Sequence, residues 1–221
     1  MYSVLMSKFS VGFPIIREEL KKIINVESKV VVIPWSFAKE LESKDIKEFF
    51  CKENRPDYYN ALYSLGIKDN NIVVLDCYNN SKEDMIKEIN SSDVIVLTGG
   101  NPEMLYNKIK SSGIIDVLKK YKKTIIGSSA GAELQLNKYF ITKKNNYYNK
   151  FAWYDGLGII NNDFYFDVHS VNKGRYLPSL RERSKEIKKD IYCLFDTGII
   201  ICNRCNNEIK IFGDVIKYSN K

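Results

Sequence analysis

The residue types best suited to chemistry lie in the segment Gly127-Ser128-Ser129-Ala130-Gly131-Ala132. It fits the pattern Gly-x-Ser-x-Gly with Ser129 at the centre, and it directly follows a short apolar run. Where a strand turns sharply into a helix, the residues two before and two after the central serine crowd each other, so glycine fits both positions. The turn exposes the serine hydroxyl, and the helix start supplies a backbone amide and the positive end of a dipole. The pattern predicts Ser129 as a nucleophile, the alternative being a tightly packed glycine turn with an idle serine.

A serine hydroxyl needs a base to become nucleophilic near neutral pH. His169 is the only histidine in the chain, so it is the only imidazole that could serve. It follows the alternating run Phe164–Val168, which is typical of a strand, and we therefore expect it at or near a strand end. Together with Ser129 it predicts nucleophilic catalysis by a serine and a histidine.

A carboxylate should orient the imidazole. Asp196 is favoured because it follows a short apolar strand and precedes Thr197-Gly198, where a loop at the end of a sheet would begin. Asp155, before Gly156, is the second choice, and Glu133 is a further candidate. Asp167 lies two residues from His169 on one strand, so the two side chains would run parallel rather than face each other. The sequence leaves the choice among these acids open.

Backbone donors for an oxyanion are expected at two places. One is the amide of Ala130, directly after Ser129. The other is Gly99-Gly100-Asn101, which ends the apolar run Asp93–Thr98 and lets the backbone approach a ligand closely. A plain turn from strand to helix is the alternative reading of this Gly-Gly pair. It is not a phosphate loop, because neither G-x-G-x-x-G nor G-K-[ST] follows.

The elements that must position these residues alternate between strands and helices. Continuous Val/Ile runs indicate strands covered on both faces, hence a parallel sheet, and the strand–helix repetition predicts an α/β fold with three layers. We expect helix from Lys44 to about Leu65, broken near Pro56, and from Ser81 to Asn90 with Ser81 as the N-cap. The expected strands are Lys29–Pro34, Asn71–Cys77, Asp93–Thr98 and Thr124–Gly127.

The last third of the chain differs. Asp190–Leu194, Gly198–Cys202 and Glu208–Phe212 read as consecutive strands with a turn at Asn206-Asn207, which predicts an antiparallel edge. Lys138–Trp153 is polar and rich in Tyr and Asn, so we expect a long loop near a site. With no linker or repeat in between, residues 1–221 are expected to form a single domain.

Composition excludes several classes. The 221 residues are 44% hydrophobic and 28% charged, which excludes general disorder, and no apolar run approaches the ~20 residues of a membrane helix. The N-terminal residues do not read as a signal peptide, so a cytoplasmic protein without membrane contact is expected. The net charge of +7 is spread over lysine pairs, which favours a solvated surface and makes nucleic-acid binding the lesser alternative.

The five cysteines include one C-x-x-C pair, Cys202 and Cys205. A zinc site needs about four ligands, and no second pair is present, so we expect no metal. The pair lies between apolar strands, which predicts reduced thiols at a hairpin.

The order of these motifs, strand–Gly-Gly-Asn, then Gly-x-Ser-Ala-Gly-Ala, then Asp-x-His, then Arg-Glu, resembles the peptidase E (α-aspartyl dipeptidase) family of serine peptidases. The resemblance runs from about Lys29 to Phe212. It implies the fold of class I glutamine amidotransferases, with a mostly parallel central sheet, and no cofactor.

By position, the resemblance implies Ser129 as nucleophile, His169 as base, Asp196 as the acid, and Gly100 and Ala130 at the oxyanion hole. Gly99 and Asn101 would contact substrate. Arg181 matches the family's Arg-Glu segment, which implies a clamp for the acidic side chain of a substrate.

We therefore expect a serine peptidase that cleaves small peptides through an acyl-enzyme, including dipeptides with N-terminal aspartate, as a monomer or homodimer. The chain departs from the family beside the site, with Val168 before the histidine, Ser128 before the nucleophile and Glu133 after Gly-Ala. The alternative is therefore a catalytically inactive binding or sensor domain of the same fold.

Overall fold

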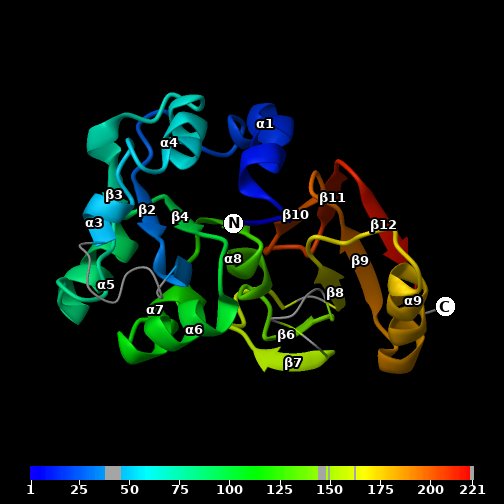
Figure 1. Ribbon diagram of the computed structural model, residues 1–221. Coiled ribbons are helices and arrows are strands. Elements are labelled where there is room, and N and C mark those ends of the chain that lie inside the picture. The colour runs from blue at the N-terminus through cyan, green and yellow to red at the C-terminus, as the bar shows by residue number, and fades with distance from the viewer. Residues whose placement is uncertain (38–45, 144–147, 149, 162, 220–221) are drawn as a thin grey trace.

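A twisted, mostly parallel sheet forms the centre of the molecule in the computed structural model, which describes residues 1–37, 46–143, 148, 150–161 and 163–219 (Figure 1). Its strand order within the described residues is β11-β10-β1-β5-β4-β2-β3. The five strands from β1 to β3 in this order run parallel, and β10 and β11 are antiparallel at one edge. Their bounds are β1 Tyr2–Met6, β2 Val30–Ile33, β3 Ile72–Val74, β4 Val94–Leu97, β5 Thr124–Ser128, β10 Ile199–Asn203 and β11 Ile209–Phe212.

Helices cover both faces of this sheet. Alternate strand residues face opposite sides, so Val31 and Ile95 belong to one core cluster while Val32 and Val94 belong to the other. The first cluster packs against the helices below the sheet in Figure 1, and the second against those above it. The predicted three-layer α/β fold is therefore confirmed. The covering helices are α5 Lys82–Ser91, α6 Pro102–Ser111 and α7 Ile115–Lys120 below, and α1 Phe9–Leu20 and α4 Pro56–Tyr63 above.

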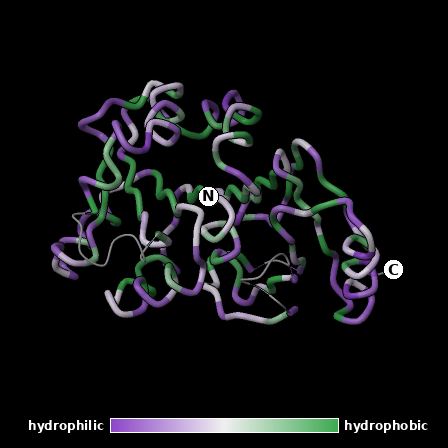
Figure 2. Tube along the Cα trace, viewed as in Figure 1, coloured by the Kyte–Doolittle hydropathy of each residue, from purple (hydrophilic) through white to green (hydrophobic). Residues whose placement is uncertain are grey.

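The hydropathy of the chain follows this layering. Figure 2 shows the most hydrophobic stretches along the strands in the middle, with hydrophilic turns of the helices outside. Side chains such as those of Leu5, Ile33 and Ile125 are fully buried there. No helix among the described residues is long and apolar enough to span a membrane.

Helix starts obey local capping chemistry. The Ser81 hydroxyl accepts from the Asp84 N–H at 3.1 Å, which confirms the predicted cap. Pro56 begins α4, after the short helix α3 (Ile46–Phe49), so the predicted break near Pro56 is also confirmed. The first residues of that predicted helix, 44 and 45, lie outside the described residues. The described residues of this half also include the 3-10 turns η1 Trp35–Phe37 and η2 Asp69–Asn71.

The three predicted C-terminal strands are present, and the predicted antiparallel edge is confirmed for β10 and β11 of the central sheet. β10 and β11 form the expected hairpin, with Asn207 in the turn at φ 59°. The strand β9 (Asp190–Leu194) instead joins a second sheet of order β12-β9-β8, with β8 Phe164–Asp167 and β12 Val215–Tyr218. β8 and β9 are parallel and are linked by a crossover through α9 (Tyr176–Ile187).

The predicted long loop over Lys138–Trp153 contains a hairpin. Strands β6 (Lys138–Ile141) and β7 (Ala152–Asp155) pair antiparallel, with the rings of Tyr139 and Tyr154 stacked 5.5 Å apart. Aromatic side chains pair across the strands and stabilise what the polar composition suggested was loop. Residues 144–147 and 149 of this stretch lie outside the described residues.

The sequence reading missed the first strand and the first helix. β1 is five residues long and carries two serine or tyrosine positions, which weakens its apolar signal, yet it lies in the middle of the sheet between β10 and β5. The cysteine pair lies as expected at the β10–β11 hairpin, Cys202 buried in the strand and Cys205 exposed in the turn, and neither forms a disulfide.

Candidate functional site

Ser129 lies at the sharp turn between β5 and the one-turn helix α8 (Ala130–Glu133). Its φ of 48° and ψ of −117° are strained for any residue other than glycine. A Cβ built on Gly127 would lie 2.1 Å from the Gly131 carbonyl oxygen, and one on Gly131 would lie 2.1 Å from the Leu97 oxygen. The predicted steric need for two glycines is therefore confirmed.

The helix that begins after Ser129 has only one turn. Its four residues are followed by a segment whose carbonyls, at Leu134 and Gln135, accept hydrogen bonds from Leu157 and Ile159 instead of continuing the helix. So short a helix contributes little dipole to the site, and individual backbone amides matter more.

His169 follows β8 directly, as expected, and faces Ser129. Its Nε2 lies 3.0 Å from the Ser129 Oγ, so the imidazole can accept the hydroxyl proton. The residue has a φ of 52°, the left-handed region, which is uncommon for a non-glycine residue. Its backbone N–H donates to the Ser7 Oγ at 2.7 Å, and the next residue, Ser170, donates to the Leu194 oxygen at 3.0 Å.

Asp196 is the candidate acid that the structure brings to the imidazole. Its Oδ1 lies 3.4 Å from the His169 Nδ1, in a turn after β9 closed by a hydrogen bond from Gly198 to Phe195. The Asp196 side chain is 58% exposed, and its other oxygen lies 3.6 Å from the Lys8 ammonium. The contact is long and partly solvated, which distinguishes it from a deeply buried acid.

The other acids have different surroundings. Asp167 is fully buried and accepts hydrogen bonds from Ser170, Thr142 and Tyr176, so it holds the loop beneath His169. Burial, and next the negative charge of Asp167, raise the pKa of Tyr176, which keeps that hydroxyl a donor. Asp155 is exposed at the end of β7, opposite Lys138.

Glu133 is buried within α8, four residues after Ser129. Burial, and next the charge of Glu133, raise the pKa of Tyr139 on β6. Glu133 therefore faces the hairpin side of α8.

Gly99 and Gly100 lie beside Ser129. A Cβ on Gly99 would lie 3.3 Å from the Ser129 Cβ, and Gly100 has a φ of 137° with the Ser36 oxygen 2.7 Å from where a Cβ would lie. Within the described part of the chain, no hydrogen bond is formed by the backbone N–H of Gly100 or of Ala130. Both amides are thus available as donors to a ligand.

Two neighbouring side chains hold the Gly-Gly turn. The Ser36 hydroxyl contacts the Thr98 hydroxyl at 2.8 Å and the Gly99 carbonyl, and the Tyr58 hydroxyl accepts from the Gly99 N–H at 3.4 Å. Burial raises the pKa of Tyr58, against the effect of its hydrogen bonds to Ser128 and Gly99, so it stays a neutral phenol. Asn101 caps α6, its side-chain oxygen accepting from the Met104 N–H at 3.0 Å. Neither Ser36 nor Tyr58 was signalled by the sequence.

Arg181 is not brought to Ser129 or His169. Arg181 is exposed on α9. Its positive charge acts to lower the pKa of Tyr218, so Arg181 lies on the side of the helix near Tyr218. Residues two apart on a helix point about 200° apart, so Arg181 and Arg183 cannot face the same cavity. Arg183 lines a cavity of about 350 Å³ together with Thr142, Lys143, Phe151, Arg175, Tyr176, Ser179 and Leu180.

Two residues that line this cavity are linked to the chain segment that carries His169. Thr142 and Tyr176 line it and also bind Asp167, two residues before His169. Its charged members are Lys143, Arg175 and Arg183, with the Arg183 guanidinium 4.2 Å from the ring centroid of Phe151. A cavity with three cations and an aromatic wall suits an anionic group. Within the described residues, no cluster of three or more metal-ligating side chains is found.

Comparison with known proteins gives one family. The model of peptidase family S51 matches residues 11–202. A protein from Listeria monocytogenes EGD-e that carries the name peptidase E aligns with a TM-score of 0.59 at 20% identity, over 98% of this chain and 96% of that one. A peptidase from an acI-B1 Actinobacterium aligns with a TM-score of 0.61 at 14% identity, over 100% and 91%. At these identities the two structures show the shared fold. No curated protein matches the sequence.

Proposed function

Since the chain belongs to peptidase family S51 and is thus a serine-type peptidase, we propose that Ser129, His169 and Asp196 form its catalytic triad. The observation that carries this proposal is the 3.0 Å contact between the Ser129 Oγ and the His169 Nε2. Two residues from different parts of the chain, both with positive φ, meet at hydrogen-bond distance. Strained backbone of this kind clusters at active sites, where the surrounding structure maintains it. We also propose that residues 1–221 act as one domain, while the cytoplasmic location and the oligomeric state stay predictions.

The proposed reaction proceeds in two halves. His169 accepts the Ser129 proton while the Oγ bonds to the scissile carbonyl carbon, and the amides of Gly100 and Ala130 donate to the resulting oxyanion. His169 then gives its proton to the leaving nitrogen, the C–N bond breaks, and an acyl-enzyme remains. Water, deprotonated by His169, attacks the ester carbon, and the proton returns to the Ser129 oxygen as the acid product leaves.

The substrates are small peptides with an acidic N-terminal residue. Supporting this are the cations Lys143, Arg175 and Arg183 around the cavity of about 350 Å³. We assign the acidic side chain to this cavity rather than to Arg181, because Arg181 points to the opposite side of α9. A guanidinium fork binds a carboxylate with two parallel hydrogen bonds, which a neutral side chain cannot match.

The test is hydrolysis of a panel of Asp-X, Glu-X and Ala-X dipeptides, run with Ser129→Ala and with labelling by a fluorophosphonate. We expect cleavage of the acidic members, one label per chain, and a loss in turnover of about 10⁶ in Ser129→Ala. Ser91→Ala, a serine at the opposite end of the sheet, serves as the control and should keep full activity. A Ser129→Ala protein with wild-type turnover would exclude the proposed nucleophile.

Two arginine variants on one helix separate the assignments of specificity. Arg183→Gln should raise the KM for Asp-X about tenfold or more, because a charged pair in the cavity is lost, while Arg181→Gln should change it little. The reverse result would show that Arg181, and not Arg183, binds the acidic side chain of the substrate. Absence of both labelling and cleavage in the wild type would favour the alternative, an inactive binding domain of this fold.

A further inference from the structure

Three consecutive residues at the end of β1 each hold one member of the proposed triad. The Met6 carbonyl accepts from the Ser129 backbone N–H at 2.8 Å. The Ser7 hydroxyl accepts from the His169 backbone N–H at 2.7 Å. The Lys8 ammonium lies 3.6 Å from the Asp196 carboxylate.

The strand order explains why so short a segment reaches three distant parts of the chain. β1 lies between β5, which leads into Ser129, and β10, which follows the turn that carries Asp196. Its end therefore emerges between the two. The Ser7 backbone N–H also donates to the Gly198 oxygen at 3.0 Å, so Ser7 binds the Asp196 turn with its main chain and His169 with its side chain.

The Ser7 hydroxyl has a second contact that bears on the imidazole. Its Oγ lies 3.5 Å from the His169 Nδ1, close to the 3.4 Å that separates this nitrogen from Asp196. Ser7 is fully buried, whereas the Asp196 side chain is 58% exposed. Water can compete for the carboxylate, but it has no access to the hydroxyl.

The backbone conformation of His169 also requires a contact such as the one with Ser7. Its φ of 52° is unfavourable for a residue with a Cβ and persists only where surrounding contacts enforce it. The 2.7 Å bond from its N–H to a buried acceptor is such a contact. Removing the acceptor would leave a polar group unsatisfied at the base of the imidazole.

We propose that Ser7 is a positioning residue, whose buried hydroxyl fixes the backbone and the ring of His169 so that Nε2 stays directed at Ser129. The proposal rests on the proposed triad and deepens it. Ser7 acts through His169 and touches no reacting atom, while Met6 and Lys8 hold the other two members.

The chain offers a direct probe of this role. Because His169 is its only histidine, the imidazole signals in an NMR spectrum of protein labelled with ¹⁵N-histidine belong to this residue alone. We expect the neutral ring of the wild type to be protonated at Nδ1, since Nε2 must accept from Ser129. In Ser7→Ala we expect a mixture of the two tautomers or a shift of the titration midpoint.

Ser3→Ala is the matched control. Ser3 is fully buried on β1, the strand that Ser7 directly follows, and among the described residues its hydroxyl has no hydrogen-bond partner. The control should leave the imidazole spectrum and the turnover unchanged. Equal spectra in Ser7→Ala and Ser3→Ala would overturn the proposal.

Kinetics on an acidic dipeptide supply the second readout. Ser7→Ala should lower kcat about 10- to 100-fold while KM stays within about twofold, because a misdirected base slows the chemical step and leaves binding intact. Ser7→Thr, which keeps the hydroxyl, should recover most of the loss. A loss confined to KM, or equal in Ser7→Thr and Ser7→Ala, would argue against positioning.

Two further outcomes are distinguishable. Should Ser7→Ala fail to fold, the single variant Asp196→Asn provides the test. If the His169 ring keeps its tautomer in Asp196→Asn, Ser7 holds the ring. If the ring becomes a mixture of tautomers there, Ser7 does not hold it and the proposal is wrong. Should the wild type cleave no peptide and resist labelling, the proposed function fails, yet the NMR comparison still tests the contact between Ser7 and His169.

Discussion

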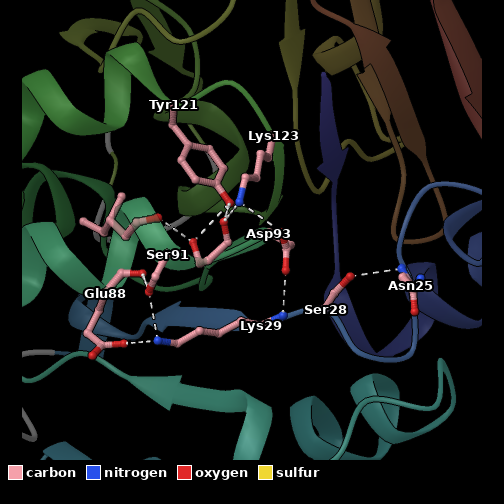
Figure 3. Close-up of polar contacts among 10 residues, drawn as sticks. Asn25, Ser28, Lys29, Glu88, Ser91, Asp93, Tyr121 and Lys123 are labelled. Atoms are coloured by element: carbon pink, nitrogen blue, oxygen red, sulfur yellow. Dashed lines mark hydrogen bonds and ion pairs between the residues drawn. The ribbon is translucent and has the colours of Figure 1, made fainter.

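The polar groups at the carboxyl end of the parallel strands differ from those at the amino end in backbone strain and in hydrogen-bond length. At the carboxyl end, Ser129 and His169 have positive φ, and the contacts between His169 Nδ1 and its partners are 3.4 and 3.5 Å long. At the amino end, the residues before β2, β4 and β5 form a dense network with ordinary backbone geometry (Figure 3).

That amino-end network joins two lysines to one aspartate. The backbone N–H of Lys29 and the ammonium of Lys123 both donate to Asp93, each at 3.0 Å. The Lys29 ammonium lies 2.6 Å from Glu88, and the Tyr121 hydroxyl donates to the Ser92 carbonyl at 3.2 Å. Figure 3 shows these groups directed at one another around the start of the strands.

Their electrostatics follow from these contacts. Partial burial acts to raise the pKa of Asp93, but hydrogen bonds from the Lys29 amide and the Lys123 ammonium outweigh it and leave the pKa below its ordinary value. Burial raises the pKa of Tyr121 to about 12. Lys29 pairs with Glu88 and Lys123 with Asp93, which favours stability over reactivity.

The contrast teaches where this fold stores strain. One sheet sets the positions of both ends, but the strained backbone of Ser129 and His169 lies at the carboxyl end. Substitutions at the two ends should therefore separate activity from stability, and three of them test this separation.

The largest effect is expected for Asp196→Asn at the carboxyl end. It should lower kcat/KM about 100- to 1,000-fold, less than the ~10⁴ of a buried triad acid, because Asp196 is half exposed. The free energy of unfolding should change little, since exposed carboxylates contribute little to it. Steady-state kinetics and urea titration measure the two quantities.

Asp155→Asn and Glu133→Gln are the matched variants at the other candidate acids. Both should retain near wild-type kcat, because Asp196 is the acid that lies 3.4 Å from the His169 Nδ1. If Asp155→Asn or Glu133→Gln loses more activity than Asp196→Asn, the assigned acid is wrong.

Gly131→Ala should destabilise the protein by about 3 kcal/mol, since its Cβ would lie 2.1 Å from the Leu97 oxygen and backbone would have to move. Activity should fall with it, because the shift displaces Ser129. Gly113→Ala is the control. Its φ is 69°, and its Cβ would meet only the flexible Lys82 side chain, at 3.1 Å, so about 1 kcal/mol is expected. Equal losses would mean that the structure accommodates a Cβ at position 131 without the expected backbone movement.

The smallest effect is expected for Asp93→Ala at the amino end. Loss of its bonds to Lys29 and Lys123 should cost about 1 kcal/mol in the free energy of unfolding and leave kcat unchanged. Because the pKa of Asp93 is lower in the folded protein than its ordinary value of 3.8, its ionised carboxylate stabilises the folded state at a pH above 3.8. This stabilisation is lost as the pH falls through the pKa of the folded protein. The difference between wild type and variant should therefore be full at pH 7 and shrink below pH 3.8. A difference that does not change with pH would exclude the charge as its source.

The features that the sequence predicted correctly depend on neighbours along the chain. The glycines around Ser129, the cap at Ser81 and the start of α4 at Pro56 are decided by steric and hydrogen-bonding demands within a few residues. Continuous Val/Ile runs likewise indicated strands buried on both sides, and hence the three-layer fold. The lone histidine left one choice of base.

The features that the sequence missed or misread depend on partners far along the chain. The strand over Tyr2–Met6 is short and weakly apolar, and only its position between β5 and β10 makes it central. The hairpin over Lys138–Asp155 depends on aromatic contacts across its strands rather than on local composition. The side of α9 that faces the cavity, and with it the roles of Arg181 and Arg183, follows from how that helix packs.

The sequence by itself thus determined the sharp turn at Ser129, the candidate base and the class of fold, because local geometry leaves few alternatives there. Only the tertiary structure decided which carboxylate lies beside the His169 ring and placed the Ser7 hydroxyl next to the same ring nitrogen. Strand order is the physical reason. Contacts between β10, β1 and β5 join residues more than a hundred positions apart, and no local pattern specifies which strands lie side by side.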